Sequence, residues 1–158
     1  MSDVRCALAG AWLSVRARRV THFPRVLRLL AALEAAAPSA LRYRHRARLR
    51  LGLQAAVVME MLREARPEAD VTSAVERYFP EGGSGQAGGG EEPWVQEAQS
   101  GFRELVLELL QEPGRRRRYL ETQAPQDYGA RFLGSLEALF HELLLRVESA
   151  LPRPHLPQ

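Results

Sequence analysis

Apolar residues recur every three or four positions along most of this 158-residue chain, which is the period of a helix with one buried face. The first such stripe predicts a helix over about Asp3–Val20, and Ser2 in front of it is a suitable N-cap. The apolar positions of this helix are Val4, Ala7, Leu8, Ala11, Trp12 and Val15.

Proline residues mark where the next helices begin and end. A second helix is predicted from the HFP segment at 22–24 to the next proline, and a third one extends to Ala65. The third helix is expected to continue through Gly52. Because AAVVMEML at 55–62 is apolar on nearly every side, this helix is also expected to be central in the fold.

The middle of the chain combines a short helix with a glycine-rich stretch. Pro67 opens a predicted fourth helix, and Pro80 ends it. Residues 81–92 contain six glycines and no apolar side chain larger than alanine, so they are predicted to form a flexible loop. A phosphate-binding loop is not expected, because neither G-K-[ST] nor a GxGxxG between a strand and a helix is present.

Two more long helices are predicted near the end, at about Pro93–Glu112 and Gln126–Ala150. The inward face of the first of them is expected to include Trp94 and Ala98. Between the two helices, a Pro–Gly pair breaks the pattern. Arg115–Arg118 follow it and are predicted to lie in a loop, with a short helix over Arg115–Leu120 as the alternative.

Composition supports a helical fold and excludes several classes of enzyme. Leu, Ala, Arg and Glu are strong helix formers and dominate the chain, whereas β-branched residues are few. All 22 basic residues are arginine, so no lysine is available for a phosphate loop, a Schiff base or kinase-type ATP binding. We therefore predict a single all-α domain over residues 2–152, a bundle of six to seven or more helices around a long central helix, and a disordered tail at 153–158.

The net charge of +3 conceals two oppositely charged halves. Residues 1–53 contain eleven arginines and two acids, whereas residues 54–114 contain four arginines and twelve acids. The run RYRHRARLR at 42–50 is the strongest local charge, but a helix would place its alternate arginines on opposite sides. These arginines either cover apolar surface and pair with acids, or contact an acidic partner or nucleic acid.

Candidate catalytic and metal-binding groups are few. His141–Glu142 begins an HExxH zinc motif, but Leu145 stands where the second histidine is needed. The single cysteine, Cys6, is expected to be half-buried on the first helix, and the absence of a second cysteine fits a reducing compartment. We expect no enzyme activity, metal, cofactor or small-molecule substrate. We also expect no membrane contact, because no apolar run is long enough to span a bilayer.

Several short motifs occur in a recognisable order, and the most specific are HFPRVL at 22–27 and LRYRH at 41–45. With them, the chain resembles the N-terminal domain of the TRF-interacting nuclear factors, the bridging subunits of the telomere-protecting complex shelterin. The resemblance covers about Ala7–Pro152. Its other motifs are Gly52, Leu53, Ala55, Val57 and Val58, RP at 66–67, FPE at 79–81, EAQ at 97–99, YG at 128–129, FL at 132–133 and ALP at 150–152.

This resemblance implies a TRFH-like helical domain, related to the dimerisation domain of the double-strand telomere binders, that acts in the nucleus at telomeres. It implies an adaptor that docks one segment of a telomere-repeat-binding factor and one of the shelterin subunit that recruits the single-strand binder and telomerase. Direct contact with DNA is not expected. We place docking on the first helix, whose small side chains allow close approach of a partner backbone, at Ala7, Leu8, Ala11 and Val15. The alternative is that these residues only pack the bundle.

The chain departs from the family in one respect. The family carries a Phe-x-Leu-x-Pro segment beyond this domain that binds the other telomere-repeat factor. No such segment occurs here, so this chain is expected to bridge fewer partners or to be a shorter form. The glycine-rich loop and Arg115–Arg118, which could be a nuclear-import patch, lie outside the shared pattern. Two alternative functions stay open: a basic helical domain that binds nucleic acid directly, and an unrelated helical peptide-groove regulator.

Overall fold

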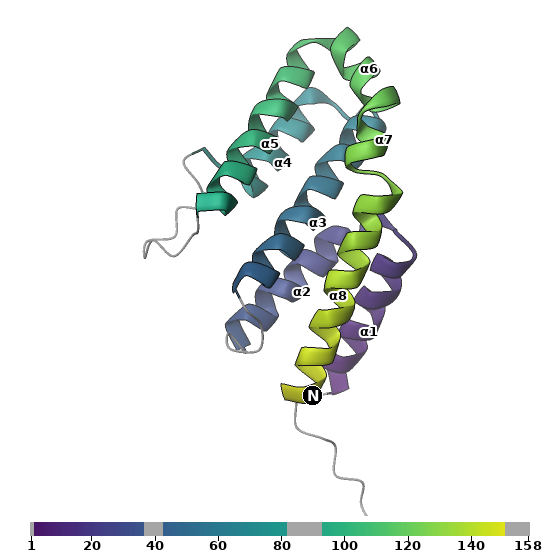
Figure 1. The fold of residues 1–158 in the computed structure, drawn as a ribbon, viewed down its shortest axis with the longest axis vertical. Helices are drawn as coiled ribbons and strands as arrows, with labels where there is room; N and C mark the ends of the chain where they lie inside the picture. Colours follow the sequence, from purple (N-terminus) through teal and green to yellow (C-terminus); the bar gives the residue numbers. More distant parts are fainter. Residues whose placement is uncertain (1, 37–42, 82–92, 151–158) are drawn as a thin grey trace, which may run out of the picture.

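The computed structural model describes residues 2–36, 43–81 and 93–150, and every regular element within them is helical (Figure 1). This confirms the predicted all-α fold. None of these helices is long and apolar enough to cross a membrane. The elements are α1 (Ser2–Arg16), the 3-10 turn η1 (Val20–His22), α2 (Phe23–Ala36), α3 (Tyr43–Arg63), α4 (Glu68–Tyr78), α5 (Pro93–Gln111), α6 (Pro113–Thr122), α7 (Ala124–Asp127) and α8 (Ala130–Ala150).

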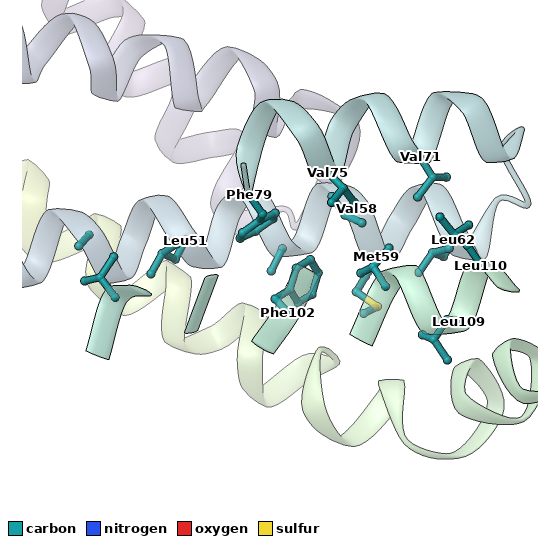
Figure 2. Close-up of a cluster of buried hydrophobic side chains, with 14 residues drawn as sticks. Leu51, Val58, Met59, Leu62, Val71, Val75, Phe79, Phe102, Leu109 and Leu110 are labelled. Atoms are coloured by element: carbon teal, nitrogen blue, oxygen red, sulfur yellow. The ribbon is translucent and has the colours of Figure 1, made fainter. Parts of the chain in front are cut away.

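Helix α3 is the central element, as expected, and it packs against α2, α4, α5 and α8 (Figure 1). Its residues supply two hydrophobic cores. Leu49 and Leu53 pack with α1, α2 and α8, whereas Val58 and Met59 pack with α4 and α5 (Figure 2). Burial on both sides of one helix explains why its sequence is apolar on nearly every side.

The helix α3 passes through Gly52 without a break, as predicted. Gly52 is buried and faces Leu136 of α8, whose side chain would overlap a Cβ atom at this position. The glycine therefore lets α3 and α8 approach each other closely.

Helix α1 ends at Arg16, so the predicted end at Val20 is wrong. Arg18 adopts a left-handed conformation with a φ of 58°, and the Arg19 N–H donates to the Ser14 carbonyl at 2.9 Å. This hydrogen-bond pattern closes a helix and turns the chain into η1. No glycine or proline signals the turn in the sequence.

Arg115–Arg118 lie in helix α6, so the prediction of a loop is wrong and the alternative of a short helix is confirmed. Pro113 occupies the first turn of α6, where its missing N–H and fixed φ are tolerated. Arginine is itself a good helix former. Arg115 also pairs with Glu108 at 3.3 Å and with Glu112 at 3.9 Å. The Pro–Gly pair therefore separates two helices.

The last long helix begins at Ala130, so the predicted start at Gln126 is also wrong. The single turn α7 precedes it, and the chain breaks at Gly129 between the two. Glycine is required at this break, because a Cβ atom there would overlap the Pro125 carbonyl. Tyr128 packs beside this break, with its ring centroid 5.7 Å from Phe102 and 5.1 Å from Phe132.

Two burial predictions also need correction. On α5, Trp94 is half-buried and Ala98 is exposed, whereas Val95 and Gln99 are buried. The predicted face also includes Phe102, Leu105, Val106 and Leu109, and Phe102, Val106 and Leu109 are buried. The prediction is therefore wrong by one position at the start of α5 only, where the polar Gln99 is buried. Cys6, expected to be half-buried, is exposed. The predicted loop at 81–92, apart from Glu81, and the predicted tail at 153–158 lie outside the described residues.

Candidate functional site

A surface groove of about 320 Å³ runs between α1 and α8, and we call it the α1–α8 groove. Trp12 stacks on the buried ring of Phe140 with centroids 6.2 Å apart and lies 5.5 Å from the His141 ring. Leu145 on α8 is 58% exposed, which is unusual for a large apolar side chain in this fold. The groove is lined by Arg5, Leu8, Ala9, Trp12, His141, Leu144, Leu145 and Glu148.

The four residues predicted for docking occupy different environments. Leu8 lines the α1–α8 groove although it is largely buried. Ala7 is exposed on the same helix, whereas Ala11 and Val15 belong to the core that α1 shares with α2, α3 and α8. The structure therefore brings Leu8 to a candidate surface and directs Val15 inward.

Sequence reasoning missed the half of this groove that α8 supplies. His141, Leu144 and Leu145 were not singled out as a docking surface. Leu145 could have indicated this surface, because it is a large apolar residue outside the apolar stripe that periodicity predicts for its helix. That stripe consists of Phe132, Leu133, Leu136, Leu139, Phe140, Leu143, Leu144 and Val147. Pairing Leu145 with α1 requires knowledge of which helices are neighbours, and periodicity does not contain that information.

A second groove of about 340 Å³ lies between α3, α5 and α8, and we call it the α3–α5–α8 groove. A row of aromatic rings forms part of its surface: Phe79 and Phe102 have centroids 4.7 Å apart, and Tyr128 and Phe132 continue the row. Burial raises the pKa of Tyr128 to about 12, and the nearby Asp127 carboxylate adds to this shift. The remaining lining residues are Arg48, Leu51, Gly52, Ala55, Trp94, Ala98, Ser135, Leu136 and Leu139.

Two ion pairs lie beside the grooves. Arg5 and Glu148 pair at 3.7 Å across the α1–α8 groove. Arg103 joins α5 to α4 through Glu76 at 2.8 Å and donates to the Phe79 carbonyl at 2.9 Å. The Glu76 hydrogen bond raises the pKa of this guanidinium. The first of these ion pairs links α1 to α8, and the second links α5 to α4.

The chemistry that these grooves offer is binding of apolar side chains. Their surfaces consist largely of leucine, alanine and aromatic residues. Among the described residues, no three histidine, cysteine or acidic side chains gather where they could hold a metal ion. A helical bundle with open apolar grooves is the architecture of a protein-interaction domain that receives short segments of partners.

The comparison with known families agrees with this class. The chain matches the family model described as the N-terminus of TERF1-interacting nuclear factor 2 over residues 12–158, and it belongs to this family.

Two relatives illustrate the similarity. The human protein named TERF1-interacting nuclear factor 2 is 40% identical over 159 aligned residues, covering 98% of this chain and 35% of the human protein. The mouse protein of the same name is 40% identical over 151 residues, covering 96% of this chain and 42% of the mouse protein. The chain thus spans well under half the length of these two relatives.

Proposed function

We propose that this chain is a non-enzymatic adaptor of shelterin that acts in the nucleus at telomeres by docking short segments of other proteins. The observation that carries this proposal is membership of a family whose members are named for their interaction with TERF1. The two apolar grooves supply surfaces suited to such docking.

One docked segment belongs to a telomere-repeat-binding factor, and it occupies one of the two grooves. The second belongs to the shelterin subunit that recruits the single-strand binder and telomerase, and it occupies the other. Leu145 is 58% exposed, and covering it stabilises a complex by about 1–2 kcal/mol.

Small residues on α1 support the placement of one segment in the α1–α8 groove. Ala9 lines this groove, and Ala7 lies exposed on the same helix. Both leave room for the backbone of a partner. We therefore expect a large charged side chain at Ala9 to block one partner only.

Titration calorimetry with peptides from the two partners tests this expectation. Ala9→Arg should weaken binding of one peptide by about tenfold or more, which corresponds to 1.4 kcal/mol per factor of ten. The matched control is Ala138→Arg, which adds the same side chain at an exposed position of α8 that lines neither groove. Unaltered affinity of both peptides for Ala9→Arg would rule out the α1–α8 groove as a docking site.

Direct nucleic-acid binding is the alternative function, and it predicts a different result. A nucleic-acid domain would bind duplex DNA with an affinity that falls steeply as salt is raised, because phosphate contacts release counterions. We expect no retention of the folded protein on duplex DNA at low salt. Salt-sensitive retention together with no peptide binding would replace our proposal by the nucleic-acid alternative.

A further inference from the structure

A third surface, formed by η1, α2, α3 and α4, shares no lining residue with either groove. Two hollows of about 460 and 300 Å³ adjoin each other there, and both are lined by Pro24, Arg77 and Tyr78. We call this surface the α3 trough. The proposed adaptor function does not use it.

One face of α3 forms the floor of the trough. The floor residues are spaced four, three, four and three positions apart, so they lie in one line along the helix. This line is about 21 Å long at a rise of 1.5 Å per residue. η1 and α2 form one wall and α4 the other. The floor residues are Arg50, Gln54, Val57 and Met61 of α3, and Glu64 in the turn directly after it.

Charge in the trough is separated along its length. The end near Glu64 also carries Glu60 and Asp70. Arg66 pairs with Glu64 at 3.8 Å and with Asp70 at 3.5 Å, and Arg63 pairs with Glu60 at 3.6 Å. Three carboxylates thus face two guanidinium groups, and this end keeps a surplus of negative charge.

The opposite end of the trough is basic. It carries Arg28 and Arg50 against one acid, Glu34. Arg77 lies where the two hollows adjoin. Within the described ranges, neither Arg28 nor Arg77 makes an ion pair. The surface between Arg77 and the acidic end is apolar, with Val57, Met61 and Ala74.

We propose that the α3 trough docks an amphipathic helix of a partner protein that is basic at one end, apolar in the middle and acidic at the other end. A straight trough bounded by helices suits a helix of about 14 residues laid along it. Basic side chains lie over Glu60 and Glu64, and acidic side chains lie over Arg28 and Arg77. The charge separation fixes which end of the partner helix lies where.

A second copy of this chain is a poorer occupant. In the part of the chain that the structure describes, the only large apolar side chains with high exposure are Leu13 and Leu145. They lie on different helices, α1 and α8. No described helix of a second copy could therefore offer a row of apolar anchors to the trough.

A pair of synthetic peptides of about 15 residues tests the proposal, since this length spans the trough. Both carry leucines at positions 4, 8 and 11 and the same total composition. One has arginines in its first turn and glutamates in its last, and the other mixes both charges at each end. Fluorescence anisotropy should show the charge-separated peptide binding about tenfold or more tightly than the mixed one, a difference of 1.4 kcal/mol per factor of ten.

Protein variants then locate the binding. Ser73→Arg places a large cation on the exposed wall of the trough and should weaken the charge-separated peptide by about tenfold or more. Ser100→Arg is the matched control, because Ser100 is an exposed helical serine outside the trough, and it should bind normally. A circular dichroism spectrum establishes that both variants are folded.

Four results would overturn the proposal. Three of them are equal affinity of the two peptides, absence of binding by both, and unchanged affinity in Ser73→Arg. A protein that sediments as a dimer, and becomes monomeric in Ser73→Arg, would make a second copy the occupant and would also overturn it. Each of these leaves the adaptor function intact, because Ala9→Arg tests that function in a different groove.

Discussion

Arg18 and Ala65 adopt left-handed backbone conformations, with φ values of 58° and 55°, although neither is glycine. Each follows the last turn of a long helix, where this conformation lets the chain reverse. Arg18 is also held by its side chain, which donates to the Ala130 carbonyl at 3.1 Å at the start of α8. Ala65 is exposed and has no comparable side-chain contact, because its side chain is a methyl group.

We predict that Ala65→Gly stabilises the protein. The left-handed conformation costs an alanine about 1–2 kcal/mol. Glycine avoids this cost, but its greater conformational freedom in the unfolded state lowers the resulting stabilisation by about 0.4–1 kcal/mol. Urea unfolding should therefore show a free energy of unfolding about 0.5–1 kcal/mol higher. The control Ala138→Gly, at an exposed site inside α8, should lower it by about 1 kcal/mol. A loss of stability in both variants would contradict the account of this turn.

Tyr128 predicts a dependence of stability on alkaline pH. Burial raises its folded-state pKa from 10.0 to about 12, so the neutral phenol is favoured in the folded state. The stabilisation is complete below pH 10 and is lost as the pH rises through about 12. In urea unfolding at several pH values, Tyr128→Phe should lose less stability over this range. A residual loss is expected from Tyr119, whose pKa burial also raises. Identical pH profiles for the two proteins would contradict the burial of this phenol.

At the scale of elements, the close approach of α3 and α8 depends on Gly52. A methyl group there would overlap the buried side chain of Leu136. Overpacking of this kind costs about 1–3 kcal/mol, which exceeds the helix propensity of about 1 kcal/mol that alanine gains over glycine. We predict that Gly52→Ala lowers the free energy of unfolding.

Gly101 supplies the matched control for this prediction. It is exposed within α5, and a Cβ atom there meets nothing within 4 Å. Gly101→Ala should therefore raise the free energy of unfolding by about 1 kcal/mol. If Gly52→Ala and Gly101→Ala stabilise equally, α3 and α8 are further apart than described.

Sequence periodicity predicted the long helices well because each has a strongly apolar face, and α3 is apolar on nearly every side. It failed where local rules are ambiguous. A Pro–Gly pair ends one helix and begins another at α6, and Gly129 interrupts a continuous apolar stripe before α8. The predicted buried face was wrong at the start of α5, where Gln99 is buried although it is polar. These outcomes depend on tertiary contacts, which override local preference.

At the scale of the whole molecule, the α3–α5–α8 groove exists because α3 contributes to two hydrophobic cores, of which Figure 2 shows the one shared with α4 and α5. α8 packs with the first core, α5 with the second, and a groove remains between them. The docking residues predicted from the sequence lie on α1, and one of the four, Leu8, lines the α1–α8 groove. The sequence could not supply the wall on α8, since residues 8 and 145 meet only through the fold.

The two tryptophans of the chain provide the most direct test of the adaptor account, because Trp12 lines the α1–α8 groove and Trp94 the α3–α5–α8 groove. Their indole N–H resonances can be followed in ¹⁵N-labelled protein as each partner peptide is added. The account predicts that the telomere-repeat-factor peptide shifts one indole resonance, that the peptide of the second subunit shifts the other, and that duplex DNA shifts neither. If both indole resonances stay in place at saturating peptide while the protein remains folded, the adaptor account is wrong.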